Sequence, residues 1–238
     1  MKFTDCGYII NLRKHGENSL IITVITKEHG KVTGYVKGVL HKKNLSIYQL
    51  GNYIKFDAYS RVDNNMLSFR VELISPDAVN FIEDEHKLVF LSSLCSLCNV
   101  CLPELEDLDV LYNKVDDFFK FIHEENWLTY YSFFEFYFLE FLGVGLDLSK
   151  CAVTNTTNDL KYISPKSGRA VCGDVGEAYK EKLFSYPHYI LNNNYKAERS
   201  EVLNLLKMTE FFLQKNFFAE HGLKFPQNRV NLREILGY

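Results

Sequence analysis

Three cysteines at intervals of three residues form the first pattern in this sequence that could do chemistry. Cys95, Cys98 and Cys101 make a C-x-x-C-x-x-C run, which is typical of thiolate ligands for an iron–sulfur cluster. The bacterial ferredoxin pattern continues with a fourth cysteine and a proline, but Leu105 and Glu106 stand at those places. Because Cys95 and Cys98 share the helical spacing of nearby leucines, we expect them to pack in a core as small apolar residues.

Acidic residues are the second candidate, because carboxylates can hold the divalent ions of a nuclease. Residues 79–140 contain 13 acidic and 3 basic side chains. On amphipathic helices the same carboxylates form a solvated face, which is the interpretation we prefer. The acids concerned are Asp107, Asp109, Asp116, Asp117, Glu124 and Glu125.

Motifs that carry nucleotide or hydrolase chemistry are missing from the sequence. It contains no G-x-x-x-x-G-K-[ST] loop, no G-x-G-x-x-G turn, no H-E-x-x-H helix and no G-x-S-x-G elbow. Nucleotide hydrolysis, dinucleotide chemistry and common hydrolase chemistry therefore lack their usual residues. We expect a protein that is not an enzyme and uses no cofactor.

Basic and aromatic side chains alternate with apolar ones in the first 78 residues, which hold 11 basic and 7 acidic side chains. Successive side chains of a strand point to opposite faces, so we expect Tyr35 and Lys37 on the face opposite Val36. Bases stack on rings while cations hold phosphates, so this combination suits single-stranded nucleic acid. The alternative is a solvated face, because tyrosine is favoured in strands anyway. The outward set is Lys31, Tyr35, Lys37, Tyr53, Lys55, Tyr59 and Arg61, beside a basic run with Lys42 and Lys43.

The chain of 238 residues is long enough for one or two domains. Strand patterns end near Pro76, and five strands of this length fit a small closed barrel. Helical patterns follow, interrupted by a turn-rich insert at 147–175. We expect an α+β fold with a nucleic-acid-binding domain at 1–78 and a helical domain at 79–238. The expected strands are 8–14, 19–27, 31–37, 52–61 and 66–74, and the expected helices are 88–102, 110–122, 128–142, 176–184 and 199–220.

Two features argue against export and membrane insertion. The first residues reach Asp5 without the apolar core of a signal peptide. The apolar stretch 128–148 carries Glu135 and Glu140 in its middle, which a membrane span would not tolerate well. We therefore expect a cytoplasmic protein with reduced cysteines.

The insert has half of the ligands of a zinc ribbon. Cys151 and Cys172 flank it, where a ribbon uses C-x-x-C at each end, but the partner positions hold Thr154 and Val175. Two thiolates cannot close a tetrahedral structural site. The sequence therefore predicts a ribbon-like segment without its metal.

Several motifs together resemble one protein family. GYIINLRKHGENS at 7–19, TKEHGKVTG at 26–34, FLEFLGVGLDLSKCAVT at 138–154 and YISPKSGRAV at 162–171 closely resemble the bacterial DNA repair protein family RecO, in order and over essentially the whole chain. The resemblance implies an OB-type N-terminal barrel, a helical C-terminal domain and a small inserted ribbon that binds zinc through four cysteines in some relatives. It also implies that basic barrel residues bind DNA, here Arg13, Lys14, Lys31, Lys37, Lys42 and Lys43.

The resemblance also implies a function and partners. RecO-like proteins are recombination mediators that bind single- and double-stranded DNA, anneal strands coated by single-stranded-DNA-binding protein, and with RecR help to load RecA at gaps. We expect Lys166 and Arg169 at the insert tip to extend the basic track, and the basic residues after 141 to form the pocket for the partner's C-terminal tail. A protein-only scaffold and a metal-dependent nuclease are the rival hypotheses.

Overall fold

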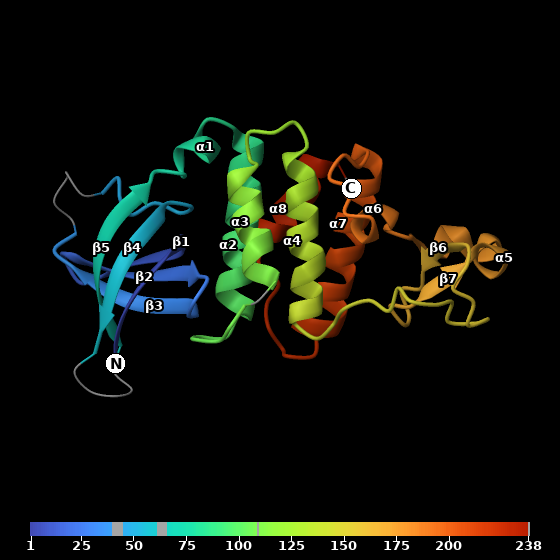
Figure 1. Ribbon diagram of the computed structural model, residues 1–238, viewed down its shortest axis with the longest axis horizontal. Coiled ribbons are helices and arrows are strands. Elements are labelled where there is room, and N and C mark those ends of the chain that lie inside the picture. Colours follow the sequence, from blue (N-terminus) through green and yellow to red (C-terminus); the bar gives the residue numbers. More distant parts are fainter. Residues whose placement is uncertain (40–44, 61–65, 109, 238) are drawn as a thin grey trace. The chain divides into compact units, whose positions relative to one another are not determined.

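Five N-terminal strands followed by helices give the computed structural model an α+β arrangement (Figure 1). The structure describes residues 1–39, 45–60, 66–108 and 110–237. The strands close into a barrel in the order β1-β2-β3-β5-β4. They are β1 (Lys2–His15), β2 (Ser19–Thr26), β3 (Gly30–Lys37), β4 (Tyr53–Tyr59) and β5 (Leu67–Ser75).

One face of each strand fills the barrel core, and β4 shows the alternation most clearly. Ile54, Phe56 and Ala58 are buried, whereas Lys55 and Tyr59 are exposed. This is the period-two pattern of a strand with one face toward an apolar interior. The faces expected for this strand from its sequence are confirmed.

β1 is longer than its sequence pattern indicates. It begins at Lys2 because residues 2–8 pair with β4, where Lys2 lies opposite Tyr59. A bulge between Ile9 and Asn11 shifts its register with β2. A bulge bends a strand and increases its twist, which helps β1 to cross between its two neighbours in a small barrel.

The first half of β3 is covered by the segment that follows helix α2 (Glu85–Cys101). β3 pairs in parallel with β5 over only two positions, so the edge before them needs another partner. The backbone N–H of Leu105 donates to the carbonyl oxygen of Lys31 at 2.9 Å. A Cβ added to Gly30 would lie 1.8 Å from the carbonyl oxygen of Glu106, so this close approach requires glycine.

The described chain divides into two compact units. The first comprises Met1–Asn113 and Pro226–Gly237, and the second comprises Lys114–Phe225. Besides the barrel, the first unit holds α1 (Val79–Ile82), α2 and α8 (Gln227–Leu236), and α2 packs against both β1 and α8. α3 (Val110–Lys120) spans the boundary between the units. α8 lies beyond the last helix expected from the sequence, and Pro226 directly precedes it.

The second unit is organised around α4 (Trp127–Phe141) and α7 (Arg199–Phe212), which pack against each other. Glu135 is fully buried on α4. It accepts hydrogen bonds from the Tyr131 hydroxyl, at 2.8 Å, and from the Thr209 hydroxyl on α7. These donors offset the cost of burying the carboxyl group, so Glu135 links the two helices. α7 continues as a π-helical turn, η2 (Leu213–Phe218). The short helix α6 (His188–Leu191) precedes α7.

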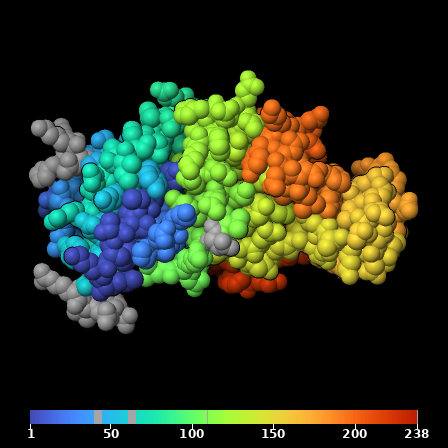
Figure 2. Space-filling model, in the orientation of Figure 1, coloured from blue at the N-terminus to red at the C-terminus, as the bar shows by residue number. Residues whose placement is uncertain are grey.

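The insert at 147–175 supplies two strands of a three-stranded sheet in the order β7-β6-β8, and the third strand, β8, follows it in the chain. The strands are β6 (Leu160–Ile163), β7 (Ala170–Cys172) and β8 (Phe184–Ser185). The helix expected at 176–184 is wrong: the structure has a short α5 (Gly173–Gly176), a 3-10 segment η1 (Glu177–Lys182) and then β8. Figure 2 shows the insert, in yellow and orange, as a lobe of the second unit. Within the described part of the chain, no helix is long and apolar enough to cross a membrane.

Candidate nucleic-acid interface

Tyr35 on β3 lies at the centre of an aromatic and basic cluster on the outer face of the barrel. The ring of His15 meets it edge-to-face, with 5.4 Å between centroids, and Lys37 Nζ lies 5.9 Å from the Tyr35 ring centre. The Tyr35 hydroxyl donates to Ser19 Oγ at 2.6 Å. These contacts fix a half-buried ring at the surface, which is what a stacking platform for bases needs.

Two hollows lie beside this cluster. The first hollow, of about 290 Å³, lies where β3 meets β5. The second hollow measures about 410 Å³, and Tyr59 and Arg70 line both. Tyr59 is 47% exposed, and Arg70 is exposed on β5. Tyr35 and Tyr59 both pair with Ser68, so their backbones are two strand spacings, about 10 Å, apart. The other lining residues include Lys2, Lys37, Tyr48 and Asp57.

Arg13 and Lys14 add positive charge at the end of β1, where both side chains are exposed. Arg13 lies opposite Ile21, and Ile21 lies opposite Tyr35. Residues directly opposite each other in antiparallel strands share a face, so Arg13 and Tyr35 belong to one row across β1, β2 and β3. An exposed cation in the same row as a half-buried ring suits the phosphate backbone of a nucleic acid.

Lys31 does not reach this surface, which corrects its expected position. Its side chain is 9% exposed, lies 3.6 Å from Glu104 Oε1 and donates from Nζ to the Asn99 carbonyl oxygen at 3.1 Å. Glu104 also accepts from the backbone N–H and the hydroxyl of Thr33. The segment that covers the edge of β3 thus buries Lys31, although strand alternation alone sends it outward.

Tyr53 and Lys55 lie nearer the other end of β4. Tyr53 packs on Tyr8, with 4.7 Å between ring centroids. It precedes Tyr59 by six residues, or about 20 Å of strand, so the structure does not bring it into the cluster. Lys55 is exposed on the same face as Tyr59, about 13 Å away along the strand. Lys42, Lys43 and Arg61 lie outside the described residues.

Sequence reasoning missed Lys2, Tyr48 and Arg70. Arg70 could have been found by alternation, because Leu67 and Phe69 of β5 are buried and Arg70 is exposed. Tyr48 stands between strands, and its place beside β3 follows from the path of a connecting segment. Lys2 joins the hollow only because the start of β1 pairs with β4.

Comparison with known proteins decides the family. The family model "Recombination protein O N terminal" matches residues 1–76, and "Recombination protein O C terminal" matches residues 82–222. The chain belongs to the RecO family. It is 36% identical over 236 residues to the DNA repair protein RecO of Wolbachia sp. subsp. Drosophila simulans (strain wRi), with 96% of this chain and 98% of the relative covered. It is 34% identical to the DNA repair protein RecO of Bartonella quintana (strain Toulouse) over 241 residues, with 99% and 97% covered.

A zinc site in the insert is not supported by the residues present here. The backbone N–H of Cys172 donates to Cys151 Sγ at 3.3 Å, and the Thr154 hydroxyl lies 3.6 Å from Cys172 Sγ. Thr154 and Val175 offer no thiolate, and the described residues bring no three His, Cys, Asp or Glu side chains together as a metal site. A structural zinc needs four ligands, so the residues do not fit it.

The Cys151 thiol is nevertheless surrounded by hydrogen-bond donors. Burial opposes its ionisation, but hydrogen bonds from Thr154, Cys172 and Val153 outweigh burial and lower the pKa of Cys151 to about 6. Backbone N–H groups that point at a sulfur also stabilise a thiolate that is bound to a metal. The insert thus surrounds the Cys151 thiol with donors that suit a metal-bound sulfur, but it offers this thiol too few partner ligands for a structural zinc.

The two basic residues predicted at the insert tip differ in their contacts. Lys166 is exposed, whereas Arg169 Nε donates to Asp147 Oδ2 at 3.1 Å. Hydrogen bonds from Ser149, followed by the contact with Arg169, hold the pKa of Asp147 below its usual value. Both basic residues belong to the second unit, and the barrel belongs to the first.

The three-cysteine run is confirmed as core at two of its positions. Cys95 and Cys98 are 2% and 0% exposed on α2. Burial raises the pKa of all three thiols, to about 12 for Cys101 and further for the other two. At neutral pH they are therefore protonated thiols.

The acidic stretch forms ion pairs on α3. Asp116 pairs with Lys120 and Asp117 with Lys114. Burial is the main cause that raises the pKa of Asp117. Asp109 lies outside the described residues. The observed ion pairs are those of a charged helix face.

Proposed function

We propose that this chain is a recombination mediator in DNA repair that binds single- and double-stranded DNA without reading sequence. One observation carries the proposal: the barrel brings the exposed or half-buried rings of Tyr35 and Tyr59 together with Lys37 and Arg70 beside two adjoining hollows. Rings accept any base, and cations hold any phosphate. The names of the relatives, DNA repair protein RecO, are consistent with this role.

The strand arrangement supports the OB-type assignment within this proposal. OB folds are five-stranded Greek-key barrels that bind oligonucleotides on a strand face and adjacent loops. The order β1-β2-β3-β5-β4 with a parallel β3–β5 contact matches that description. We assign residues 1–78 to this nucleic-acid-binding domain and 79–238 to a helical domain whose insert is a zinc-ribbon-like segment without its metal.

The mediator would act by holding strands rather than by cutting or joining them. It would anneal complementary strands coated by single-stranded-DNA-binding protein and, with RecR, help to load RecA at gaps. We assign it no catalytic residue and no cofactor, and place it in the cytoplasm at the nucleoid. These finer assignments follow from the RecO resemblance and from the barrel face.

Annealing of two labelled complementary strands tests the proposal. Each strand is coated with the cognate single-stranded-DNA-binding protein, without nucleotide or metal, across a salt series. We expect acceleration that survives a chelator and fades with salt, because cations on the barrel release counterions from the phosphates. Absence of any salt-sensitive DNA binding would favour a protein-only scaffold. Magnesium-dependent strand cleavage would favour a nuclease.

The second unit contains a hollow that suits the tail of the single-stranded-DNA-binding protein. It measures about 950 Å³ and combines the rings of Phe121, Tyr130 and Tyr195 with Lys196 and Arg199. An acidic peptide with an apolar end needs such a combination. Glu124 and Glu125 also line it, so the acidic part of the tail belongs near the two cations.

Charge reversal tests this partner site separately from DNA binding. Lys196→Glu with Arg199→Glu is expected to weaken binding of a tail peptide at least tenfold and to leave the affinity for bare single strands unchanged. A tail peptide that binds the double variant as well as the wild type would place the pocket elsewhere.

A further inference from the structure

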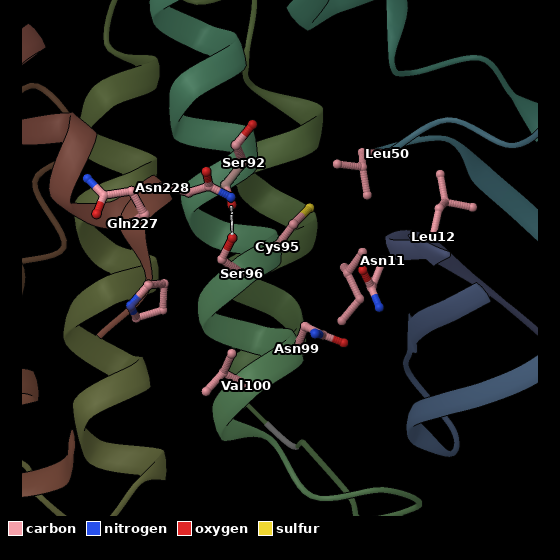
Figure 3. A pocket seen from close by; sticks show the side chains of 12 residues that line it. Asn11, Leu12, Leu50, Ser92, Cys95, Ser96, Asn99, Val100, Gln227 and Asn228 are labelled. Atoms are coloured by element: carbon pink, nitrogen blue, oxygen red, sulfur yellow. Dashed lines mark hydrogen bonds between the residues drawn. The ribbon is translucent and has the colours of Figure 1, made fainter. Parts of the chain in front are cut away.

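A groove of about 420 Å³ in the first unit lies outside the aromatic and basic cluster. Its floor is α2, one wall is β1 with Leu50, and the other wall is the start of α8 (Figure 3). Its volume lies within the range of small-molecule pockets. The lining residues are Ile10, Asn11, Leu12, Leu50, Ser92, Cys95, Ser96, Asn99, Val100, Pro226, Gln227 and Asn228.

The groove combines neutral polar groups with apolar side chains. Four of its twelve lining residues are amides and two are hydroxyls, and none of the twelve is charged. Ser96 and Asn228 are bonded to each other, since the Asn228 amide donates to Ser96 Oγ at 2.6 Å. Gln227 donates to Asn231 Oδ1 at 3.0 Å.

The amides of Asn11 and Asn99 offer both a donor and an acceptor to a ligand. Figure 3 shows these two side chains extending toward each other across the gap between β1 and α2. Both residues are half-buried. Within the described ranges, neither side-chain amide has a hydrogen-bond partner, although the backbone carbonyl of Asn99 accepts from Lys31. Half-buried amides that lack partners favour a ligand that supplies both donors and acceptors.

We propose that this groove binds a base of the same nucleic-acid strand that the barrel holds, through hydrogen bonds from Asn11 and Asn99 to the base edge. The inference rests on the proposed function and adds a second mode of contact to it. An asparagine amide carries both a donor and an acceptor, so it can turn to bond the edge of any base and the contact selects no sequence. Bases of single strands are free to turn out of the stack.

Continuity with the basic face favours a base over a peptide. Asn11 precedes Arg13 by two residues on β1, about 7 Å along the strand, and both lie beyond the bulge at Ile9. A phosphate held at Arg13 leaves its nucleoside within reach of the groove. The uncharged lining suits the base and not the phosphate, which stays with the cations outside.

Difluorotoluene has the shape of thymine but forms no such hydrogen bonds, so a comparison of the two bases separates hydrogen bonding from stacking. Two oligonucleotides of equal length, one with thymine bases and one with difluorotoluene in their place, are bound to the full chain. Binding is followed by fluorescence anisotropy at fixed salt. We expect the wild type to bind the thymine strand about tenfold more tightly. Asn11→Ala with Asn99→Ala is expected to bind both strands equally, and this change leaves the Asn99 backbone carbonyl in place. Tyr35→Ala is expected to weaken both strands by the same factor.

Asn80→Ala, on α1 in the same unit and outside the groove, is the matched control and is expected to keep the tenfold preference. Thermal denaturation shows whether each variant is folded. If the wild type binds both strands with equal affinity and this binding is still salt-sensitive, the inference is wrong but the proposed function stands. A peptide would then be the occupant to test. A wild type that binds neither strand would overturn both. If the double variant of Asn11 and Asn99 still prefers the thymine strand, the groove is not the site that binds the base.

Discussion

Lys37 and Lys31 lie on the same strand and, by alternation, on the same face, yet removal of each charge should change a different property of the protein. Lys37 is exposed beside the Tyr35 ring. Lys31, six residues earlier, is 9% exposed and contacts the Asn99 carbonyl and Glu104. Substitution by Met keeps the aliphatic stem of each side chain and removes only the ammonium group. We expect Lys37→Met to change DNA binding and Lys31→Met to change stability.

The magnitudes follow from the two environments. Loss of one phosphate contact reduces the slope of log affinity against log salt by about 0.7 for single strands. Between 50 and 200 mM salt, a fourfold change, the ratio of wild-type to Lys37→Met affinity should therefore fall by about 2.6-fold. Lys31→Met removes a buried charged hydrogen bond, a group that contributes roughly 1.5–3 kcal/mol, and should lower the free energy of unfolding by about 2 kcal/mol.

Salt titrations of oligonucleotide binding and urea denaturation of both variants provide the assay. The wild-type slope should be kept in Lys31→Met, and the wild-type unfolding midpoint should be kept in Lys37→Met. If Lys31→Met reduces the salt slope as much as Lys37→Met does, the buried position of Lys31 in the free protein does not describe the DNA-bound protein, and our reasoning fails.

Three further predictions concern separate parts of the chain. Tyr59→Ala should weaken single-strand binding at fixed salt by about 1 kcal/mol or more, as lost stacking does, whereas Tyr53→Ala should have little effect; equal losses in anisotropy titrations would contradict the grouping. Glu135→Ala should lower the free energy of unfolding by about 2 kcal/mol in urea, because the buried Tyr131 hydroxyl loses this acceptor and the Thr209 hydroxyl keeps only the Leu206 carbonyl oxygen; a change below about 1 kcal/mol would mean that water replaces the carboxyl group. Thr154→Cys with Val175→Cys should bind one zinc ion per chain in a colorimetric zinc assay, and a zinc-free double variant would show that the ribbon backbone cannot close around the metal.

The alternation within a strand predicted correctly which side chains are buried and which are exposed, wherever no distant segment covers the strand. The apolar and polar alternation of β4 is of this kind, and the structure buries Ile54 and exposes Tyr59 accordingly. Lys31 obeys the same alternation, yet a segment more than 70 residues later covers it. The sequence carries no local signal of that contact, because it depends on where the end of α2 meets β3.

The same limit explains the residues that were missed. Arg70 becomes part of the hollow through the parallel contact of β5 with β3, which only two residue pairs form. The groove with Asn11 and Asn99 joins a strand near the start of the chain, helix α2 at 85–101 and helix α8, which begins at Gln227. Amides in three distant segments do not make a recognisable spacing. Chemistry that arises from such meetings becomes visible only in three dimensions.

The cover over β3 also limits how the barrel can be used as a separate module. An exposed strand edge offers N–H and carbonyl groups to other chains, which leads to aggregation or domain swapping. A fragment cut at residue 78 would lose the bond from Leu105 to Lys31 and the acidic partner of that lysine. A fragment that reaches residue 113 would retain both. The turn after α2 therefore protects the barrel against self-association, and a study of the barrel alone needs this turn included.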